Sequence, residues 1–356
     1  MRVVVAMSGG VDSSMAAALL KQRGCDVTGV TMRIWGGAPS AEGPRHGCYG
    51  PGEQADIDDA KQVAHTLKIP FHVLDLSKEY ESEVLNYFRS EYALGRTPNP
   101  CSRCNPLIKF GALAKKVEES GIGFDYFATG LYARVEYDEK KKRKVLKKAK
   151  DLSKDQSYFL ALLSREQIDR CLFPLGEHTK QEVRRLAAEL GLPIAVKPDS
   201  QDFASGGYSF LLGSSNPGPI LDGQGRHLGE HRGIAYHTIG QRKGLGISGS
   251  KPMYVTEIDP ARNAVIVGER GEVYKHRLIA SNVNWIAIDG LERPAEFKAR
   301  IRYRHQEADA LVTPLVGNKA RVEFAEPQMA ITPGQTVVFY DGDVVVGGGT
   351  IEKAEE

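Results

Sequence analysis

The sequence contains few cysteines and lacks both a long apolar segment and a strong net charge. Five cysteines spread irregularly over 356 residues do not make the dense framework of a small disulfide-stabilised secreted protein. No segment reaches the roughly 18 to 20 apolar residues that cross a bilayer, and the first ten residues, MRVVVAMSGG, lack the basic and apolar regions of a secretory signal. We therefore expect a cytoplasmic protein with reduced thiols and without a membrane partner.

The formal net charge of +2 predicts no polyanionic partner for the chain as a whole. One segment is an exception, because residues 140–150, KKKRKVLKKAK, contain eight lysines or arginines. Such a run is typical of a binding site for phosphate backbones, but the solvated tip of a hairpin has the same composition. The sequence leaves both interpretations open.

Strand-like apolar runs alternate with helical patterns over the first part of the chain. The runs lie at 3–7, 27–35, 71–76 and 124–129. The helical patterns lie at about 13–23, 53–67, 79–91 and 107–119, and a further one extends over about 155–190 with breaks at Pro174 and Gly176. This alternation predicts an α/β fold with a mainly parallel sheet covered on both faces and a ligand site at the carboxyl edge of the sheet.

Gly-rich turns and short alternating segments replace this pattern after residue 205. From about residue 273, segments such as FKARIRYR, KARVEFAE and QTVVFYDGDVVVGGGTIE are typical of strands separated by turns, which predicts a small β-barrel. We therefore expect an α/β domain at 1–205, a small central module at 206–272 and a C-terminal β-barrel at 273–356.

The string SGGVDSS, residues 8–14, follows the first predicted strand directly. Glycines allow backbone N–H groups to turn toward an anion, and the start of the next helix adds partial positive charge. The G-K-[ST] of the common P-loop is missing, and no G-x-G-x-x-G follows the first predicted strand, which disfavours those nucleotide folds. Asp12 is a candidate Mg²⁺ ligand, and the serines are candidate phosphate donors. A plain strand-to-helix turn with a capped helix is the alternative, but the complete string in this place favours phosphate binding.

Two cysteines are spaced C-x-x-C in GRTPNPCSRCNPLIKF, residues 95–110, which we interpret as a loop ahead of a helix. A lone C-x-x-C fits half a zinc site, a redox dithiol, iron–sulfur ligands or two ordinary residues. Cys48, in the loop HGCYGPG, is the best third ligand because loops at the carboxyl edge of a sheet converge. A structural zinc site that adds His46 is an alternative. Cys25 and Cys171 are typical of packing cysteines.

SGGVDS resembles the signature of the PP-loop, or N-type ATP pyrophosphatase, superfamily, whose members split ATP between its α and β phosphates and adenylate a carbonyl oxygen. Together with GRTPNPCSRCNPLIKF, KDQSYFL, FPLGEHTKQEVR, PGPILDGQGRHLGEHRG and HTIGQRKGLGI, the chain resembles the tRNA-specific 2-thiouridylase family over nearly its whole length. The resemblance implies a PP-loop catalytic domain that adenylates the C2 oxygen of the wobble uridine in the tRNA anticodon stem-loop and replaces it with sulfur. It implies ATP and Mg²⁺ as cofactors and sulfide or a persulfide carrier as sulfur donor.

The resemblance also assigns roles to residues through matching motifs. It implies that Cys104 is the catalytic nucleophile. Cys101, three residues before it, and Asp12 of the phosphate loop are the other candidate catalytic residues. The implied ATP site consists of Ala6, Met7, Ser8, Gly9, Gly10, Val11, Asp12, Ser13, Met32 and Gly130. The implied tRNA contacts are Lys154, Asp155, Gln156, Arg302, Tyr303 and Gln335.

The chain departs from the common family pattern at three positions. Cys101 replaces an aspartate, Leu131 replaces a histidine, and Ala204 stands where the second catalytic cysteine receives sulfur as a persulfide. One explanation is a [4Fe-4S] cluster held by Cys48, Cys101 and Cys104, whose open iron binds sulfide. Another is a persulfide on Cys104 that Cys101 resolves. We favour the cluster because it accounts for the extra and the missing cysteines together.

Two rival functions remain from the sequence. A tRNA-binding or iron-sensing relic without activity would not need the intact SGGVDS string. Another PP-loop activity, such as an amidoligase or lysidine synthase, would need no cysteine pair.

Overall fold

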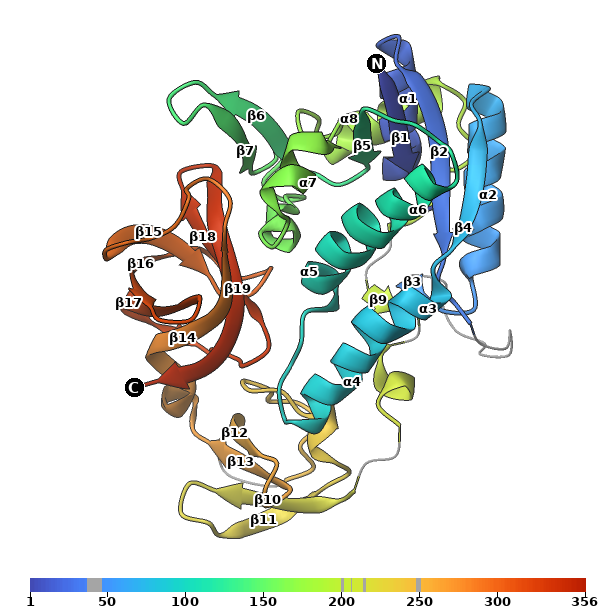
Figure 1. Ribbon diagram of the computed structural model, residues 1–356. Helices are drawn as coiled ribbons and strands as arrows, with labels where there is room; N and C mark the ends of the chain where they lie inside the picture. Colours follow the sequence, from blue (N-terminus) through green and yellow to red (C-terminus); the bar gives the residue numbers. More distant parts are fainter. Residues whose placement is uncertain (37–46, 200–201, 206, 214–215, 248–250) are drawn as a thin grey trace. The chain divides into compact units, whose positions relative to one another are not determined.

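The computed structural model describes residues 1–36, 47–199, 202–205, 207–213, 216–247 and 251–356 (Figure 1). The chain forms two compact units. The first contains residues 1–84, 101–208 and 343–345, and the second contains 85–100, 209–342 and 346–356.

A five-stranded parallel sheet forms the centre of the first unit. Its strand order is β4-β2-β1-β5-β8, and every neighbouring pair is parallel. The strands are β1 (Arg2–Ala6), β2 (Asp26–Arg33), β4 (Phe71–Asp75), β5 (Tyr126–Thr129) and β8 (Cys171–Leu172). Val3, Val4 and Val5 of the central strand are at most 1% exposed, as expected for a strand covered on both faces. The predicted α/β fold is confirmed.

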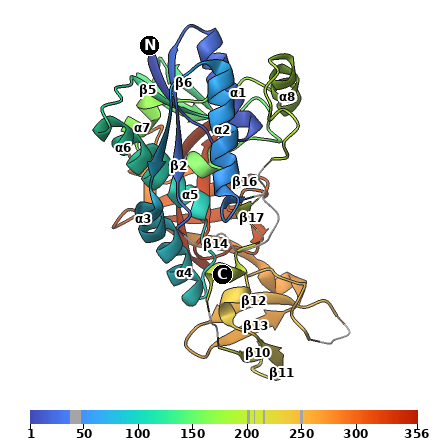
Figure 2. The ribbon, with the colours of Figure 1, turned by 90° about the vertical axis from the view of Figure 1, so that its right-hand side faces the viewer.

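Helices cover both faces of this sheet (Figure 2). On one face, α1 (Val11–Gln22) packs against α2 (Glu53–Leu67) and α8 (Lys180–Glu189). The other face carries α6 (Leu113–Glu119), which contacts β4, and α7 (Arg165–Arg170). The helical stretch expected at 155–190, with breaks at Pro174 and Gly176, is more divided than predicted. It consists of the 3-10 turn η3 (Ser157–Leu160), α7, β8 and α8, because Pro174 and Gly176 end the helical geometry between them.

The cysteine pair lies inside a helix, so the prediction of a loop ahead of a helix was wrong. The helical run begins with α5 (Pro100–Cys104), continues as the π-helix η2 (Asn105–Ala112) and ends with α6. Pro100 occupies the first helical position, where its missing N–H costs nothing. Pro106 inside the run cannot donate to the turn before it, and the chain accommodates this as the wider π-helix.

A second helical run precedes the cysteine segment along the chain. It consists of α3 (Ser77–Tyr80), the π-helix η1 (Glu81–Leu85) and α4 (Asn86–Ala93), where the sequence predicts one helix at 79–91. The hairpin of β6 (Arg134–Asp138) and β7 (Arg143–Lys147) contains most of the basic run. The short strands β3 (Gly47–Tyr49) and β9 (Asp202–Ala204) pair with each other in parallel.

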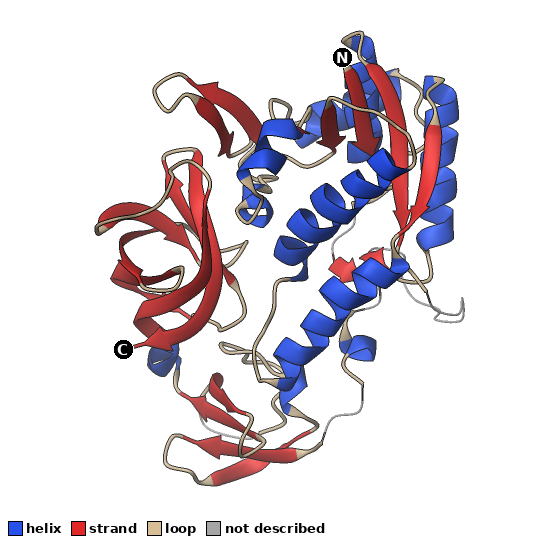
Figure 3. Cartoon of the chain, viewed as in Figure 1, coloured by secondary structure: helices blue, strands red, loops and turns tan. Residues whose placement is uncertain are grey.

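The second unit contains two β structures, drawn in red in Figure 3. A four-stranded sheet of order β11-β10-β13-β12 forms the central module around Ile220, Val255 and Val265. Its strands are β10 (Gly218–Asp222), β11 (His227–His231), β12 (Tyr254–Asp259) and β13 (Ala264–Gly268).

The C-terminal β-barrel is confirmed. Its order is β14-β17-β16-β15-β18-β19, and an additional pairing of β14 with β19 closes it. The strands are β14 (Tyr274–Trp285), β15 (Ala295–Arg300), β16 (Ala308–Leu315), β17 (Lys319–Met329), β18 (Thr336–Asp341) and β19 (Val344–Glu355). Strand β15 ends at Arg300, so the expected strand FKARIRYR is four residues too long and its last part forms a turn.

Candidate functional site

The SGGVDS string forms the turn between β1 and α1. Gly9 has a left-handed φ of +71°, and a Cβ atom there would lie 2.1 Å from the carbonyl oxygen of Asp56, so no other residue fits. Helix α1 begins without a side-chain cap at Gly10. Instead, the Ser13 hydroxyl accepts from the Ser8 N–H at 3.0 Å. This leaves an uncapped helix N-terminus behind a glycine turn, which is a suitable anion-binding arrangement.

The turn lies at the topological switch point of the sheet. Strand β1 pairs with β2 on one side and with β5 on the other, and ligands of open α/β sheets bind at the carboxyl ends of such neighbouring strands. Gly130 directly follows β5, and a Cβ atom there would lie 2.4 Å from the Ser13 backbone nitrogen. Met32 lies near the carboxyl end of β2. The fold thus brings the predicted ATP-site segments to one edge, and their role in ATP binding stays a prediction.

Asp12 belongs to a network of charges that the sequence analysis missed. Its carboxylate accepts hydrogen bonds from the Tyr132 hydroxyl at 2.9 Å and from Lys180 Nζ at 2.7 and 2.8 Å. Lys180, which is 9% exposed, also forms an ion pair of 2.7 Å with Asp199. Burial and the neighbouring Asp12 raise the pKa of Tyr132, so this phenol remains a donor.

A local signal for Lys180 exists in the sequence. The string HTKQE contains a capping box in which Thr179 and Glu182 exchange hydrogen bonds, and Lys180 is the first residue of α8. The capping box predicts the helix start correctly. It does not predict that the first helical side chain crosses to Asp12, because that contact depends on how α8 packs against α1.

The helical run of α5, η2 and α6, called the cysteine helix below, forms hydrogen bonds with the segment 155–170. Asn105, which is buried, donates to the carbonyl oxygen of Phe159 at 2.9 Å. The amide nitrogen of Gln167 donates to the carbonyl oxygens of Pro106 at 2.7 Å and Phe110 at 3.1 Å. The two Gln167 contacts satisfy carbonyl groups of the π-helix, whose hydrogen-bonding pattern is irregular. The helix that carries the cysteines is therefore well anchored on its C-terminal side.

The thiols of Cys48, Cys101 and Cys104 lie close enough to influence one another. Cys48 has an exposed side chain, and the other two are partly exposed. Even so, desolvation raises the pKa of Cys104 to about 11, and desolvation together with the nearby Cys48 and Cys104 raises the pKa of Cys101 to about 12. Lys109 opposes both shifts. The free thiols are therefore protonated at neutral pH, in contrast to the activated thiolates expected at a helix N-terminus.

Two tyrosines lie beside these thiols. Tyr80 is 2% exposed, and its pKa is raised by desolvation and by the charges of the three cysteines. Its ring stacks on that of Tyr49 at a centroid distance of 5.4 Å. Tyr49 follows Cys48 in β3, so the aromatic stack links the Cys48 strand to helix α3, which contains Tyr80.

Strand pairing places Cys48 beside the position of the missing second cysteine. Tyr49 of β3 is the register partner of Ala204 in β9, and the Ser205 N–H donates to the Tyr49 carbonyl oxygen at 2.9 Å. Ala204 is 1% exposed. Cys48 is therefore one residue from the cross-strand partner of Ala204, although 156 positions separate them in sequence (204 minus 48). Sequence reasoning could not detect this pairing, because neither strand has a strong pattern.

Three cysteine thiols are suitable ligands for an iron–sulfur cluster. In this structure, however, they are not arranged as the ligands of one metal site. In the described part of the chain, no three histidine, cysteine, aspartate or glutamate side chains are arranged to hold a metal ion. His46, the alternative zinc ligand, lies outside the described residues, as do Ser200, Gln201 and Gly206 of the string DSQDFASGG.

The predicted tRNA contacts at 154–156 have intramolecular partners. Asp155 is 3% exposed, and its carboxylate accepts from the Ala149 N–H and from the N–H and hydroxyl of Ser157. Gln156 accepts from the Tyr132 N–H at 3.0 Å. Lys154 forms an ion pair of 3.0 Å with Asp199. These contacts give the segment a structural role, and its tRNA contact stays a prediction.

Arg302 and Gln335, two predicted tRNA contacts of the barrel, are near the same turn. Arg302 donates to the Thr332 hydroxyl and to the Ile239 carbonyl oxygen. Gln335 donates to backbone carbonyls of the segment that leads to the cysteine helix. Tyr303 follows Arg302 in the turn after β15 and is partly exposed.

Some basic side chains of the run at 140–150 have intramolecular partners, and others are exposed. Lys147 forms ion pairs with Glu136 at 2.8 Å and Asp343 at 3.2 Å, and Lys144 lies over the Tyr126 ring at 4.7 Å from its centroid. Lys140 and Lys142 are exposed in the hairpin turn. The run is therefore a hairpin whose tip carries exposed positive charge, and its binding to a phosphate backbone stays a prediction.

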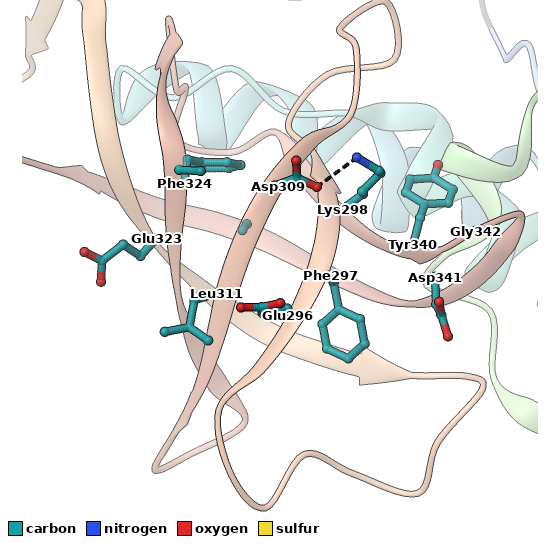
Figure 4. A pocket seen from close by; sticks show the side chains of 12 residues that line it. Glu296, Phe297, Lys298, Asp309, Leu311, Glu323, Phe324, Tyr340, Asp341 and Gly342 are labelled. Carbon is teal, nitrogen blue, oxygen red and sulfur yellow. Dashed lines mark hydrogen bonds and ion pairs between the residues drawn. The ribbon is translucent and has the colours of Figure 1, made fainter.

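A hollow of about 600 Å³ on the barrel contains none of the predicted site residues (Figure 4). Its lining includes the carboxylates of Glu296, Asp309, Glu323 and Asp341 and one cation, Lys298, which pairs with Asp309 at 2.8 Å. An acidic surface repels a phosphate backbone, so this hollow does not fit RNA.

Within the described ranges, no helix is long and apolar enough to cross a membrane.

Comparisons with known proteins cover the whole chain. The family model described as "tRNA methyl transferase HUP domain" matches residues 1–204, "tRNA methyl transferase PRC-barrel domain" matches 210–269, and "Aminomethyltransferase beta-barrel domain" matches 275–351. The tRNA-specific 2-thiouridylase MnmA of Moorella thermoacetica is 50% identical over 99% of this chain and 100% of that protein. MnmA 2 of Thermoanaerobacter sp. (strain X514) is 49% identical over 99% of this chain and 98% of that protein.

A solved complex of a 4-thiouridine synthetase with RNA and bound ATP is 17% identical to the chain, with a TM-score of 0.34. It covers 59% of this chain and 45% of that one, and this similarity is too low to support an argument.

Proposed function

Because the chain belongs to the tRNA-specific 2-thiouridylase MnmA family, we propose that it is a tRNA-uridine 2-sulfurtransferase that uses ATP to introduce sulfur at C2 of the wobble uridine. The observation that carries the proposal is that one α/β domain holds both a glycine-turn anion site at the switch point of its sheet and a group of three neighbouring thiols. An RNA-binding protein without activity would need neither feature.

In the first step, the C2 oxygen of the uridine attacks the α-phosphorus of ATP and pyrophosphate leaves. The backbone N–H groups of the turn at 8–13 and the N-terminus of α1 would hold the phosphates. A carboxylate accepts about four hydrogen bonds or ligands, and Asp12 already accepts three from Tyr132 and Lys180. We infer that Asp12 has one position left for Mg²⁺ and that Lys180 supplies positive charge beside it.

In the second step, sulfur attacks C2 of the adenylated uridine and AMP leaves with the former C2 oxygen. We propose that Cys48, Cys101 and Cys104 hold a [4Fe-4S] cluster, which, when bound, supplies sulfide at an iron without a protein ligand. The proximity of the three thiols supports these ligands. The thiols are neutral in the free protein, so metal binding would have to release their protons. Cys48 is exposed, so its side chain has room to adopt the ligand geometry.

The alternative is a persulfide route on the same helix. A persulfide on Cys104 would be attacked by the Cys101 thiolate, which forms a disulfide between the two residues and releases hydrosulfide to attack C2. A dithiol reductant would then have to reduce this disulfide. The raised pKa of Cys101, caused first by desolvation, disfavours the attacking thiolate.

The test is to incubate anaerobically purified protein with unmodified tRNA, ATP and Mg²⁺, and to measure 2-thiouridine by mass spectrometry of nucleosides. Sulfide with and without iron–sulfur reconstitution is compared with a persulfide donor without iron. The proposal expects product only after reconstitution, loss of product in Cys48→Ala and Cys104→Ala, and normal product in the control Cys25→Ala, whose side chain packs against the α/β core. Product from the persulfide donor in iron-free protein would favour the disulfide route, and no product in any arm would overturn the enzymatic assignment.

A further inference from the structure

A turn of the C-terminal barrel holds the segment that leads into the cysteine helix. The amide nitrogen of Gln335 donates to the carbonyl oxygen of Thr97 at 2.9 Å and of Pro98 at 3.3 Å. The Thr97 N–H donates in return to the carbonyl oxygen of Pro333 at 2.9 Å. Residues 95–100 and the turn at 332–335 belong to the same compact unit, so these contacts are part of its internal structure.

Two further contacts fix Thr97 within the second unit. The Thr97 and Thr238 hydroxyls are 3.1 Å apart. Gly334 has a left-handed φ of +90°, and a Cβ atom there would lie 3.0 Å from the backbone of Thr97. The close approach that glycine allows is what brings the Gln335 amide within reach of the two carbonyl groups.

Gln335 itself is held rigidly. Its N–H donates to the Thr332 carbonyl oxygen at 3.2 Å, and its carbonyl oxygen accepts from the Ile351 N–H at 2.7 Å. The Thr332 hydroxyl donates to the Ala330 carbonyl oxygen at 2.8 Å and accepts from Arg302. The turn at 332–335 is therefore fixed by contacts of its own, in addition to those with the segment 95–100.

The segment 95–100, which the turn contacts, is short and conformationally restricted. Pro98 and Pro100 fix their own φ angles and restrict the residues before them to extended conformations. Helix α5 begins at Pro100, and Cys101 is its next residue. A restraint at Thr97 and Pro98 is therefore transmitted through the covalent chain to the start of the helix that carries both cysteines.

We propose that Gln335 is a positioning residue that orients the entry of the chain into the cysteine helix. An amide nitrogen has two N–H donors, and two carbonyl groups of the segment accept from it, so Gln335 acts on this segment directly. The effect on sulfur transfer rests on the proposed function, whereas the effect on the segment itself does not.

The test replaces Gln335 by Glu, which keeps its size but presents carboxylate oxygens to the two carbonyls. Gln328→Glu is the matched control, because it makes the same change of charge in the same barrel and the Gln328 amide bonds only to Glu326. Thr238→Val is a second variant, which removes the hydroxyl group that contacts the Thr97 hydroxyl. Hydrogen exchange of the Thr97 amide is measured in the free full-length protein, and kcat and KM for tRNA are measured in the reconstituted enzyme.

Losing the two hydrogen bonds of the Gln335 amide is expected to speed exchange at Thr97 by roughly threefold to tenfold in Gln335→Glu. Losing the single contact in Thr238→Val is expected to speed it less. We also expect kcat to fall about tenfold with KM for tRNA nearly unchanged, because positioning acts in the reacting complex. Exchange equal to that of the control, with a raised KM alone, would overturn the proposal and make Gln335 a direct tRNA contact. Faster exchange in a protein that makes no 2-thiouridine would contradict the proposed function and leave the restraint established.

Discussion

Lys180 and Asp12 form a two-pronged ion pair, with Lys180 Nζ 2.7 Å from one carboxylate oxygen and 2.8 Å from the other. They are 168 residues apart in sequence and lie in the first turns of α8 and α1. Asp199 lies on the other side of the same ammonium group at 2.7 Å. If the turn at 8–13 binds the phosphates of ATP as predicted, this cation lies beside them, which leads to a prediction for Lys180.

Lys180→Met should remove this cation while keeping the apolar part of its side chain. We expect ATP affinity to fall by about tenfold or more, measured by calorimetry. We also expect the free energy of unfolding to fall by about 1–3 kcal/mol, because two partly buried carboxylates lose their partner. Arg185→Met, which removes an exposed ion pair with Glu189 on the same helix, is the control and should change neither quantity appreciably. Normal ATP affinity in Lys180→Met would contradict a role for Lys180 in the nucleotide site.

The cysteine thiols should react slowly at neutral pH in iron-free protein. Burial raises the pKa of Cys104 to about 11 and of Cys101 to about 12, above the value of about 8.5 for a free cysteine. Stability from these neutral thiols is therefore complete below about pH 8.5 and is lost as pH rises toward 11 to 12. Alkylation followed by peptide mass spectrometry should show both cysteines reacting more slowly in the folded than in the urea-unfolded protein at pH 8.5. Equal rates would mean that the thiols are not desolvated.

The exposed tip of the basic hairpin should bind the phosphate backbone of tRNA. We expect the double variant Lys140→Ala, Lys142→Ala to weaken tRNA binding and to reduce the slope of log K against log salt by about 1.5 to 2. Replacing Lys61 and Lys115, which are exposed on α2 and α6, removes the same charge elsewhere. If both double variants lose affinity equally, the hairpin tip has no specific role.

Asp155 should matter more for stability than for tRNA binding. Asp155→Ala leaves two buried N–H groups and one hydroxyl without their acceptor, so we expect the free energy of unfolding to fall by about 2 kcal/mol or more. Affinity for tRNA, measured below the unfolding transition, should stay within about twofold of the wild type. Asp58→Ala, in which an exposed contact with Gln54 is lost, is the stability control. A large loss of affinity in stably folded Asp155→Ala would restore its predicted tRNA contact.

Local sequence features predicted the framework well. The alternation of apolar runs and helical patterns, the glycine turn after the first strand and the short strands after residue 273 each depend on neighbouring residues, and the structure has the elements that they predict. The start of the cysteine helix was misjudged because Pro100 is compatible both with a loop and with the first position of a helix. The stretch at 155–190 breaks near Pro174 and Gly176 as predicted, but the sequence analysis missed the short strand β8 ahead of Pro174, which forms by pairing with β5.

The sequence by itself therefore determined the α/β domain, the barrel and the identity of the candidate chemical groups. Tertiary structure alone decided which of these groups meet. Lys180 reaches Asp12, Cys48 comes beside Ala204, and Gln335 holds Thr97 through packing between segments that are more than 100 residues apart. Such contacts depend on strand order and helix packing, which no local pattern of residues encodes.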